Sequence, residues 1–320
     1  MPIGYLGYVK LLDQFLLTNS TGLNRKIEPM MSEAVWGAGW YNAAKHTNYA
    51  DNQQSFEGNI DFELQAQTDI WNLVRDWLIE DRACSQSVIL SPNGVVVYDY
   101  TIDPADPRTG VWARSASFKI DAESLITLSV DCVALKRTET VNVIASFCES
   151  LRSNPANGIP TNPLNPAPRN RNPIPGWNAA ASVTWPNAPS FWQEPNNLTG
   201  MVLKSADINL NNNTQIIRGC TGDTNPVAVI QGTISVDGFM TLWREGGIPD
   251  PYVPDGNFTA STASVSFELG GAPALTLSLP YIVITSDAHD VQAQDTPTTR
   301  VFGIAGLGDG INPPFMMDAM

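Results

Sequence analysis

Few residues of this chain have the types and spacing that catalysis requires. The sequence contains two histidines, His46 and His289, and neither lies beside a serine or cysteine motif that would form a nucleophile and base pair. Two histidines also cannot make a histidine-rich metal site. The carboxylates of DPADPR (103–108) suggest a calcium loop, but they lack the regular ligand spacing, so we expect a turn there. The sequence therefore predicts neither an enzyme nor a cofactor.

Two other motifs carry no chemistry of their own. The run GIAGLGDG (303–310) has Ile311 where a dinucleotide fingerprint needs a third glycine, and the prolines that follow block a helix. We expect a flexible C-terminal arm there, ordered on assembly. The cysteines have no metal-type spacing and are expected to be free thiols in a reducing cytoplasm. They are Cys84, Cys132, Cys148 and Cys220.

The composition fits a globular protein with polar, weakly charged surfaces. The 320 residues allow two domains, with 43% apolar and 16% charged residues. Lys and Arg number 18 against 32 Asp and Glu, a net charge of −14, so binding to nucleic acid by neutralising phosphates is excluded. An acidic wall can still repel DNA and let it slide past, although charge alone favours the simpler explanation of solubility. No apolar run approaches the roughly 20 residues of a membrane span.

Three collinear matches predict an internal duplication. Residues 116–135 (ASFKIDAESLITLSVDCVAL) match 265–284 (VSFELGGAPALTLSLPYIVI) without a gap, at an offset of 149. FEGNIDF (56–62) matches IQGTISV (230–236), and VKLLDQF matches LKSADIN more weakly. Each copy of the longest match is expected to form two alternating strands around a tight polar turn.

The two copies share one expected order of elements. A first strand (7–18 and 201–211), a long loop (19–54 and 212–228) and a second strand (55–65 and 229–236) come first. A helix follows at TDIWNLVRDWLIEDR, with one apolar stripe and Thr68 or Asp69 as N-cap. In the second copy, GFMTLWREGG is expected to form only a turn or two. A hairpin at 87–100 and the matched block complete the first copy.

Between the copies, residues 153–200 contain ten of the 24 prolines, which excludes a central strand or helix. Because this segment also carries several tryptophans, we expect a strap that lies across its own or a neighbouring domain. The predicted domains are 1–152, a linker or strap at 153–199, a second domain at 200–302, and the arm at 303–320. We expect a mainly β fold with one short helix per unit.

The VKLLDQF start, the FEGNIDF strand before a helix, the two matched hairpins and the long loops together resemble the tail tube (major tail) proteins of long-tailed bacteriophages. The resemblance covers roughly 1–150 and 198–290. It implies tandem β-sandwich or partial-barrel domains, with single-domain members forming hexameric rings that stack into a tube. For this duplicated chain it implies a homotrimer with pseudo-sixfold rings, located in the virion tail and made in the host cytoplasm. The implied partners are further copies, a tape measure protein, transiting DNA, and tail terminator and tail-tip proteins, with no membrane.

The resemblance also assigns roles to two sets of residues. One set is polar and alternates with apolar residues along the strands, as a water-filled channel wall would need, although an ordinary solvent-exposed sheet explains the alternation equally. Its members are Glu57, Asn59, Asp61, Ser117, Lys119, Asp121, Thr127, Ser129, Asp131, Thr233, Ser235, Ser266, Glu268, Thr276 and Ser278. The other set lies in the first long loop and is expected to contact the next ring, the alternative being a loop folded on its own domain. Its members are Met30, Met31, Trp36, Trp40 and Tyr41.

Three other functions fit the sequence less closely. One is a carbohydrate-binding or adhesin-like β-sandwich that uses exposed tryptophans as sugar platforms, and another is a glycosidase with paired acids. The third is a baseplate or tail-tip ring protein of the same fold. Oligomerisation separates these functions, because a tube subunit should form rings or polymers and a binding module should stay small.

Overall fold

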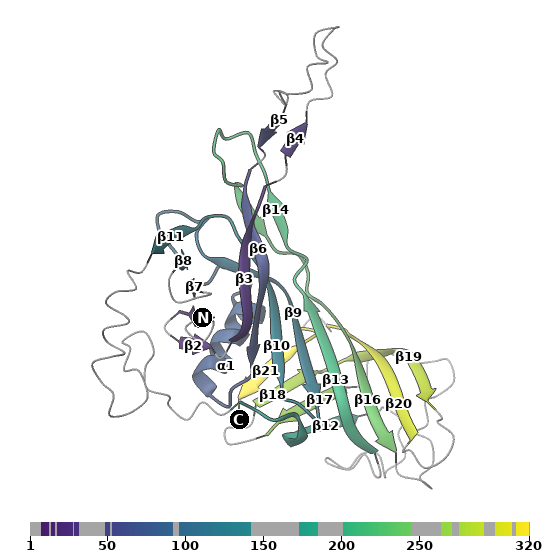
Figure 1. Ribbon diagram of the computed structural model, residues 1–320. Helices are drawn as coiled ribbons and strands as arrows, with labels where there is room; N and C mark the ends of the chain where they lie inside the picture. The colour runs from purple at the N-terminus through teal and green to yellow at the C-terminus, as the bar shows by residue number, and fades with distance from the viewer. Residues whose placement is uncertain are drawn as a thin grey trace, which may run out of the picture.

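The fold is mainly β, as the sequence predicted, in a computed structural model of the chain (Figure 1). The structure describes residues 8–12, 14–16, 18–27, 29–31, 49–51, 53–91, 96–141, 173–184, 201–244, 264–270, 275–290, 298–308 and 312–319. Its strands form one large sheet, two smaller sheets and two separate hairpins, and none of these sheets closes on itself.

The large sheet has eight strands, each antiparallel to its neighbours, in the order β19-β20-β16-β13-β9-β10-β6-β3. Their bounds are β3 Thr18–Lys26, β6 Ser55–Glu63, β9 Val111–Asp121, β10 Thr127–Ala134, β13 Met201–Asn211, β16 Ser235–Arg244, β19 Ile282–Asp290 and β20 Thr298–Gly306. One face of this sheet is buried, and the opposite face is polar on β6, β9, β10 and β13, as the period-2 alternation of these strands predicts. On β20 that opposite face carries Val301, Gly303 and Ala305.

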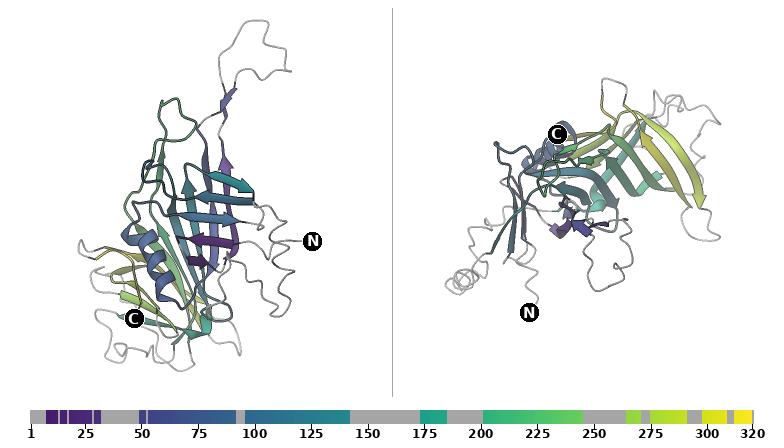
Figure 2. Two further views of the ribbon diagram at one scale, coloured as in Figure 1. Left: turned by 90° about the vertical axis from the view of Figure 1, so that its left-hand side faces the viewer. Right: turned by 90° about the horizontal axis from the view of Figure 1, so that it is seen from above.

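The two smaller sheets share one hydrophobic core with the large sheet. A five-stranded sheet, ordered β11-β8-β7-β1-β2, has strands that run across those of the large sheet (Figure 2). Its strands are β1 Tyr8–Leu11, β2 Gln14–Leu16, β7 Val88–Ser91, β8 Val96–Tyr100 and β11 Thr138–Val141. A four-stranded sheet is ordered β12-β17-β18-β21, with β12 Ala179–Thr184, β17 Ser264–Leu269, β18 Leu275–Leu279 and β21 Met316–Ala319.

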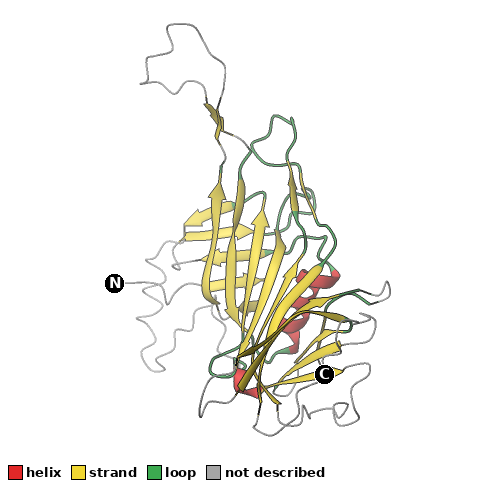
Figure 3. Ribbon diagram, turned by 90° about the vertical axis from the view of Figure 1, so that its right-hand side faces the viewer, coloured by secondary structure: helices red, strands yellow, loops and turns green. Residues whose placement is uncertain are grey.

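The predicted helix is present as α1 (Thr68–Arg75), and Asp76–Glu80 continues it as a turn of π-helix. Its N-cap is Gln67, which makes no side-chain capping bond, so the predicted caps Thr68 and Asp69 are instead helical residues. The helix buries Ile70, Trp71 and Val74, as its apolar stripe predicts. It lies on the same side of the large sheet as the four-stranded sheet (Figure 3).

The strand order of the first half of the chain recurs in the second half. In the large sheet the halves contribute β3-β6-β10-β9 and β13-β16-β20-β19, and in each the third and fourth strands in chain order exchange places. In the smaller sheets β11-β8-β7-β1 corresponds to β21-β18-β17-β12. We call the two sets of strands the first and second units.

Irregularities of the backbone fix the correspondence residue by residue. A bulge at Asn19 on β3 recurs at Lys204 on β13, and a bulge at Arg114 on β9 recurs at Thr285 on β19. The segment SFEGNIDF (55–62) then aligns with SVDGFMTL (235–242), so that Ser55, Gly58 and Phe62 match Ser235, Gly238 and Leu242.

Glycine is needed at the matched positions because the neighbouring strand approaches closely. A Cβ on Gly58 would lie 1.8 Å from the Gly22 carbonyl oxygen, and one on Gly238 would lie 2.3 Å from the carbonyl oxygen of Asp207. Gly22 and Asp207 are themselves equivalent in the two units. The repeat therefore extends from strand order to a particular backbone contact.

The structure corrects the equivalences predicted from sequence. Both parts of the longest match are hairpins, with Ser117 opposite Ser129 and Ser266 opposite Ser278. The second hairpin, β17–β18, however, lies in the four-stranded sheet and corresponds to β7–β8 rather than to β9–β10. The match of FEGNIDF to IQGTISV sets β6 mostly against the loop before its equivalent strand, β16, and so is out of register. The match of VKLLDQF to LKSADIN sets β1 and β2 against β13, which is not their equivalent. Such matches arise because apolar alternation is similar in any half-buried strand.

Several predicted elements differ in kind. The expected first strand at 7–18 is instead β1, a turn and β2, and β3 occupies the start of the expected loop. The stretch GFMTLWREGG, predicted as a helical turn in the second unit, lies largely in β16. Among the described residues the second unit therefore has no α-helix, although a single turn of 3-10 helix (Gly176–Asn178) precedes β12. Residues 231–234, part of the predicted second strand, form a loop.

The segments expected as strap and arm also contribute strands. From the proline-rich segment, β12, which itself contains no proline, forms an edge of the four-stranded sheet. The predicted flexible arm instead supplies the end of β20 and all of β21, and Phe315 and Met317 are buried in the core. One hydrophobic cluster includes residues of both units.

Candidate functional site

The polar face of the large sheet brings together side chains from both units. One row runs through consecutive register partners on five strands: Asp61, Ser129, Ser117, Asn209 and Asp237. The adjacent row on the opposite face consists of buried apolar residues: Phe62, Leu128, Phe118 and Ile208. The alternation that fills the core on one side therefore places polar groups on the other side.

The structure places most, but not all, of the predicted channel residues on this face. Nine of them lie on β6, β9 and β10 and are half-buried or exposed: Glu57, Asn59, Asp61, Ser117, Lys119, Asp121, Thr127, Ser129 and Asp131. Ser235 joins them from β16, and Thr233 lies in the loop before it. Ser266, Glu268, Thr276 and Ser278 lie in the four-stranded sheet, where Thr276 is buried.

Sequence reasoning missed the contribution of β13 and of most of β16. Ser205, Asp207 and Asn209 alternate with the buried Ala206, Ile208 and Leu210. The alternation of polar and apolar residues in KSADINLN is the sequence signal that indicates this face. On β16 the same face carries Asp237, Thr241 and an exposed aromatic residue, Phe239.

Three carboxylates of this face, those of Asp61, Asp207 and Asp237, accept hydrogen bonds from neutral side chains. The Ser129 hydroxyl donates to Asp61, and the Ser117 hydroxyl donates to Asp207 across the boundary between the units at 3.0 Å. The Asn209 amide donates to Asp237 at 3.3 Å. Such bonds orient the carboxylates without neutralising them, so the negative charge of the face remains.

A cluster of charged residues forms on the polar face around Arg114, the bulge residue of β9. The bulge turns Arg114 toward the polar face, where its Nη2 lies 2.7 Å from Glu57 Oε2 and its Nε lies 3.5 Å from Asp131 Oδ2. Burial raises the pKa of Glu57, but the hydrogen bonds from Arg114 and Ser55 and the nearby positive charges outweigh it and leave the pKa lowered. Burial dominates at Asp131 and raises its pKa.

The predicted ring-contact loop forms a projection at one end of the large sheet. Its described parts are a short hairpin, β4 (Pro29–Met31) and β5 (Tyr49–Asp51), which extends β3 and β6 beyond the sheet (Figure 1). Met30 and Met31 lie in β4. Trp36, Trp40 and Tyr41 lie outside the described residues.

The base of this projection is tied to the second unit. The loop from Gly219 to Asn225 follows β14 (Gln215–Ile217) and leads to β15 (Ala228–Ile230). The Gln54 backbone N–H donates to Thr224 O at 2.8 Å, and the Gln53 side chain bonds to Gly219 in both directions. These bonds hold the first residues of β6 in place where the projection returns to the sheet.

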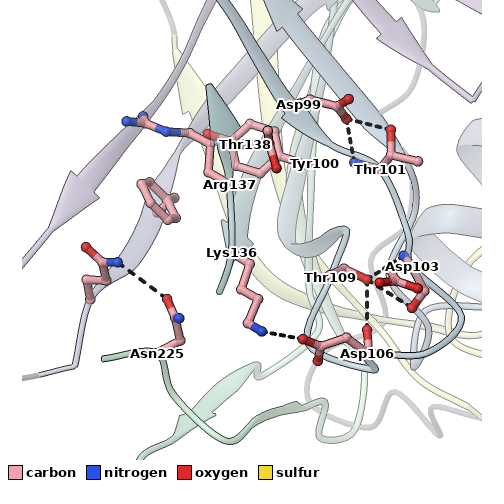
Figure 4. Close-up of a pocket in the computed structure, with 12 residues that line it drawn as sticks. Asp99, Tyr100, Thr101, Asp103, Asp106, Thr109, Lys136, Arg137, Thr138 and Asn225 are labelled. Carbon is pink, nitrogen blue, oxygen red and sulfur yellow. Dashed lines mark hydrogen bonds and ion pairs between the residues drawn. The ribbon is translucent and has the colours of Figure 1, made fainter. Parts of the chain in front are cut away.

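A hollow of about 420 Å³ lies beside this base (Figure 4). Asp106 bonds to Lys136 and Arg108 there, and these cationic partners hold the pKa of Asp106 well below its usual range. Arg108 also reaches Asp223 at 2.5 Å. Arg137 stacks over the Phe56 and Tyr98 rings, and burial raises the pKa of Tyr100 to about 12. These contacts join the 103–109 turn to the same loop as Gln53.

The remaining chemistry-bearing residues are dispersed. DPADPR forms the predicted turn, in which the Asp103 and Asp106 side chains accept backbone N–H groups. Among the described residues, no group of three or more His, Cys, Asp or Glu is placed to hold a metal ion. Cys84, Cys132 and Cys220 are free thiols, whereas Cys148 and His46 lie outside the described residues. His289 lies in β19.

Comparisons with known proteins give no relative: no protein-family model matches the chain, and no curated protein matches it. Within the described parts of the chain, no helix has the length and apolar character needed to cross a membrane.

Proposed function

We propose that this chain is a structural virion protein, the tail tube subunit of a long-tailed phage, and that its copies close into rings that stack around a DNA channel. The observation that carries the proposal is the large antiparallel sheet, which has polar residues on one face of β6, β9, β10, β13 and β16 and is packed on the other. Within the described residues both of its edges are open. The sheet is built from two units that have the same strand order, and this repetition supports tandem tube-like domains.

The open edges supply a physical reason for assembly. β3 and β19 are nine residues each, and within the described residues each pairs with a neighbour on one side only. Long unpaired edges are templates for pairing with another chain, and ring closure removes them. Because the number of strands is even, β3 and β19 run in opposite directions, so copies related by rotation would pair antiparallel.

Barrel geometry favours three copies over two. With strands ~4.8 Å apart and tilted by ~40°, sixteen strands close at a backbone diameter of ~32 Å and twenty-four at ~48 Å. Side chains then narrow the lumen on both sides. Two copies of an eight-stranded sheet would match porin-sized barrels, and three would leave a channel wide enough for a hydrated duplex.

The polar face would form the wall of this channel. Its carboxylates, together with a net charge of −14, would repel the phosphates of DNA and disfavour stops along the path. On this proposal the lumen residues are those of β3, β6, β9, β10, β13 and β16, and the projection contacts the next ring. The partners would be further copies, a tape measure protein, DNA, and terminator and tip proteins, and no catalytic activity is proposed.

Negative-stain electron microscopy of the purified protein across a concentration series tests the proposal. We expect rings or hollow tubes with threefold or pseudo-sixfold end views. Rings that never stack would favour a baseplate or tail-tip ring protein. Persistent monomers would overturn the proposal and favour a sugar-binding sandwich, because Trp177 is 73% exposed and could serve as a platform. A glycan screen would then follow.

A further inference from the structure

The chain already contains one junction between equivalent units. Within the large sheet, the two units meet where β9 of the first unit lies beside β13 of the second. They pair over seven residues, from Ser115 opposite Asn211 to Asp121 opposite Ser205. The equivalents of these two strands are β19 and β3, which are the two open edges of the sheet.

We infer that β19 of one copy pairs with β3 of the next in the register in which β9 pairs with β13. This inference rests on the proposed ring, and it adds the surface and the residue pairs by which a second copy is recognised. The partner is a rotated copy of this chain, because only such a copy presents β3 with the direction that β13 has within the chain.

The bulges convert this idea into a register. Matching Arg114 to Thr285 places Ser286 where Ser115 lies, and matching Lys204 to Asn19 places Lys26 where Asn211 lies. Successive residues then follow antiparallel. The pairs between copies are Ser286 with Lys26, Asp287 with Arg25, Ala288 with Asn24, His289 with Leu23, and Asp290 with Gly22.

The existing junction also shows which backbone bond would extend the new one. After β13, the Asn212 N–H donates to the carbonyl oxygen of the bulge residue Arg114 at 2.9 Å. The equivalent bond between copies runs from the Ile27 N–H to the Thr285 carbonyl oxygen. The bulge residue, which makes no strand pair within its own unit, would thus accept a hydrogen bond from the neighbouring unit.

Charges along the two edges are complementary in this register. Arg25 and Lys26 end β3, and Asp287 and Asp290 lie in the second half of β19. The register sets Asp287 directly opposite Arg25. Opposite charges facing one another across antiparallel strands contribute ~0.2–1 kcal/mol per pair, and like charges oppose pairing by a similar amount.

Disulfide cross-linking tests the register on the full chain. Asn24→Cys combined with Ala288→Cys places the two cysteines at a single register pair of the proposed junction, and replacing Cys84, Cys148 and Cys220 by serine removes competing thiols. The matched control is Ser20→Cys with Ser286→Cys, which also lies on the two edges but is displaced by six residues, or ~20 Å. Circular dichroism under reducing conditions checks that both variants fold.

Each outcome decides a different question. The inference is supported if only the in-register pair gives a covalent product, and a product that stops at the trimer supports the closed ring as well. Cross-linking of the control instead, or of neither variant while rings or tubes are visible, overturns the register and leaves the tube proposal standing. An open ladder of products without rings keeps the junction but contradicts the tube. Absence of rings, tubes and cross-links overturns both.

A charge exchange provides a second readout that needs no cysteine. Arg25→Asp should raise the concentration at which rings form at least about fivefold, because it faces Asp287 with a like charge. Adding Asp287→Arg to the same chain should restore assembly. Failure of the double variant to assemble better than Arg25→Asp alone would overturn the direct pairing of these two residues.

Discussion

At the residue scale, two glycines show most directly that the units repeat. Gly58 and Gly238 each face a backbone carbonyl of the neighbouring strand in the large sheet, so closely that an added Cβ would overlap it. The match was hidden in the sequence because SFEGNIDF and SVDGFMTL share only a serine and a glycine at identical positions. A close backbone approach can be seen only once the strands are paired.

Gly58→Ala is expected to destabilise the subunit by about 2–4 kcal/mol, because the added Cβ would force β3 and β6 apart. Gly22→Ala is the matched control on the facing strand, since the nearest atom to a Cβ there is 3.9 Å away. Urea unfolding measures both variants. Equal stability of the two would mean that the strands do not approach as described.

The charged cluster predicts opposite pH dependences for two neighbouring carboxylates. The pKa of Glu57 is lowered from 4.5, so its contribution to stability is present above that pH and is lost as the pH falls through the folded value. The pKa of Asp131 is raised from 3.8, so its ionisation lowers stability as the pH rises through the folded value.

Relative to the unmodified chain, Glu57→Gln should therefore lose stability at pH 7 and lose less near pH 3. Asp131→Asn should gain stability at pH 7, and this gain should disappear near pH 3, where Asp131 is protonated. Unfolding free energies at the two pH values give both differences. A loss of stability at pH 7 in Asp131→Asn would contradict the role assigned to burial.

At the element scale, the last strand is part of the core rather than an appendage. β21 pairs with β18, and the ring centroids of Phe315 and of Phe118 in the large sheet are 5.5 Å apart. The corresponding strand of the first unit, β11, takes the same place beside β8. The C-terminal residues therefore close the second unit, as 138–141 close the first.

Phe315→Ala is expected to cost about 3–5 kcal/mol, the usual range for emptying a buried aromatic site. Pro313→Ala, at an exposed position two residues earlier, is the control. Thermal unfolding distinguishes them. An unchanged melting temperature in Phe315→Ala would restore the flexible arm that the sequence suggested.

Elements that signal through their own periodicity could be predicted, and elements defined by their partners could not. The helix from Thr68 carries its stripe in one segment, and the β9–β10 hairpin carries its alternation. The stretch GFMTLWREGG has no such stripe, and its place in β16 depends on pairing with β13 and β20. The polar face was predicted for three strands and missed for β13, because faces join only when distant strands pair.

At the scale of the whole molecule, the projection should act on assembly and not on folding. Its base is anchored by Gln53 and Gln54 to the loop of the second unit, outside the short hairpin itself. Replacing 29–51 by a short turn should therefore leave the melting temperature within a few degrees and allow rings. We expect these rings to fail to stack, as judged by electron microscopy and sedimentation.

A variant with Trp36→Ala alone should show the same defect more weakly. Simultaneous loss of thermal stability and stacking would instead assign the segment to the fold of its own subunit. Unimpaired tubes would remove the projection from the contact between rings.

The joining of two units in one polypeptide also has a consequence for stoichiometry. Units in separate chains must stay identical, whereas here only the first has an α-helix among the described residues. The hairpins between the first two large-sheet strands of each unit, β4–β5 and β14–β15, also differ. A ring of three such chains would have a nearly sixfold inner wall but a threefold rim. A protein that docks on that rim would meet three equivalent positions and not six. A sixfold-symmetric partner ring would therefore either contact only every second unit or have three of its six binding sites empty.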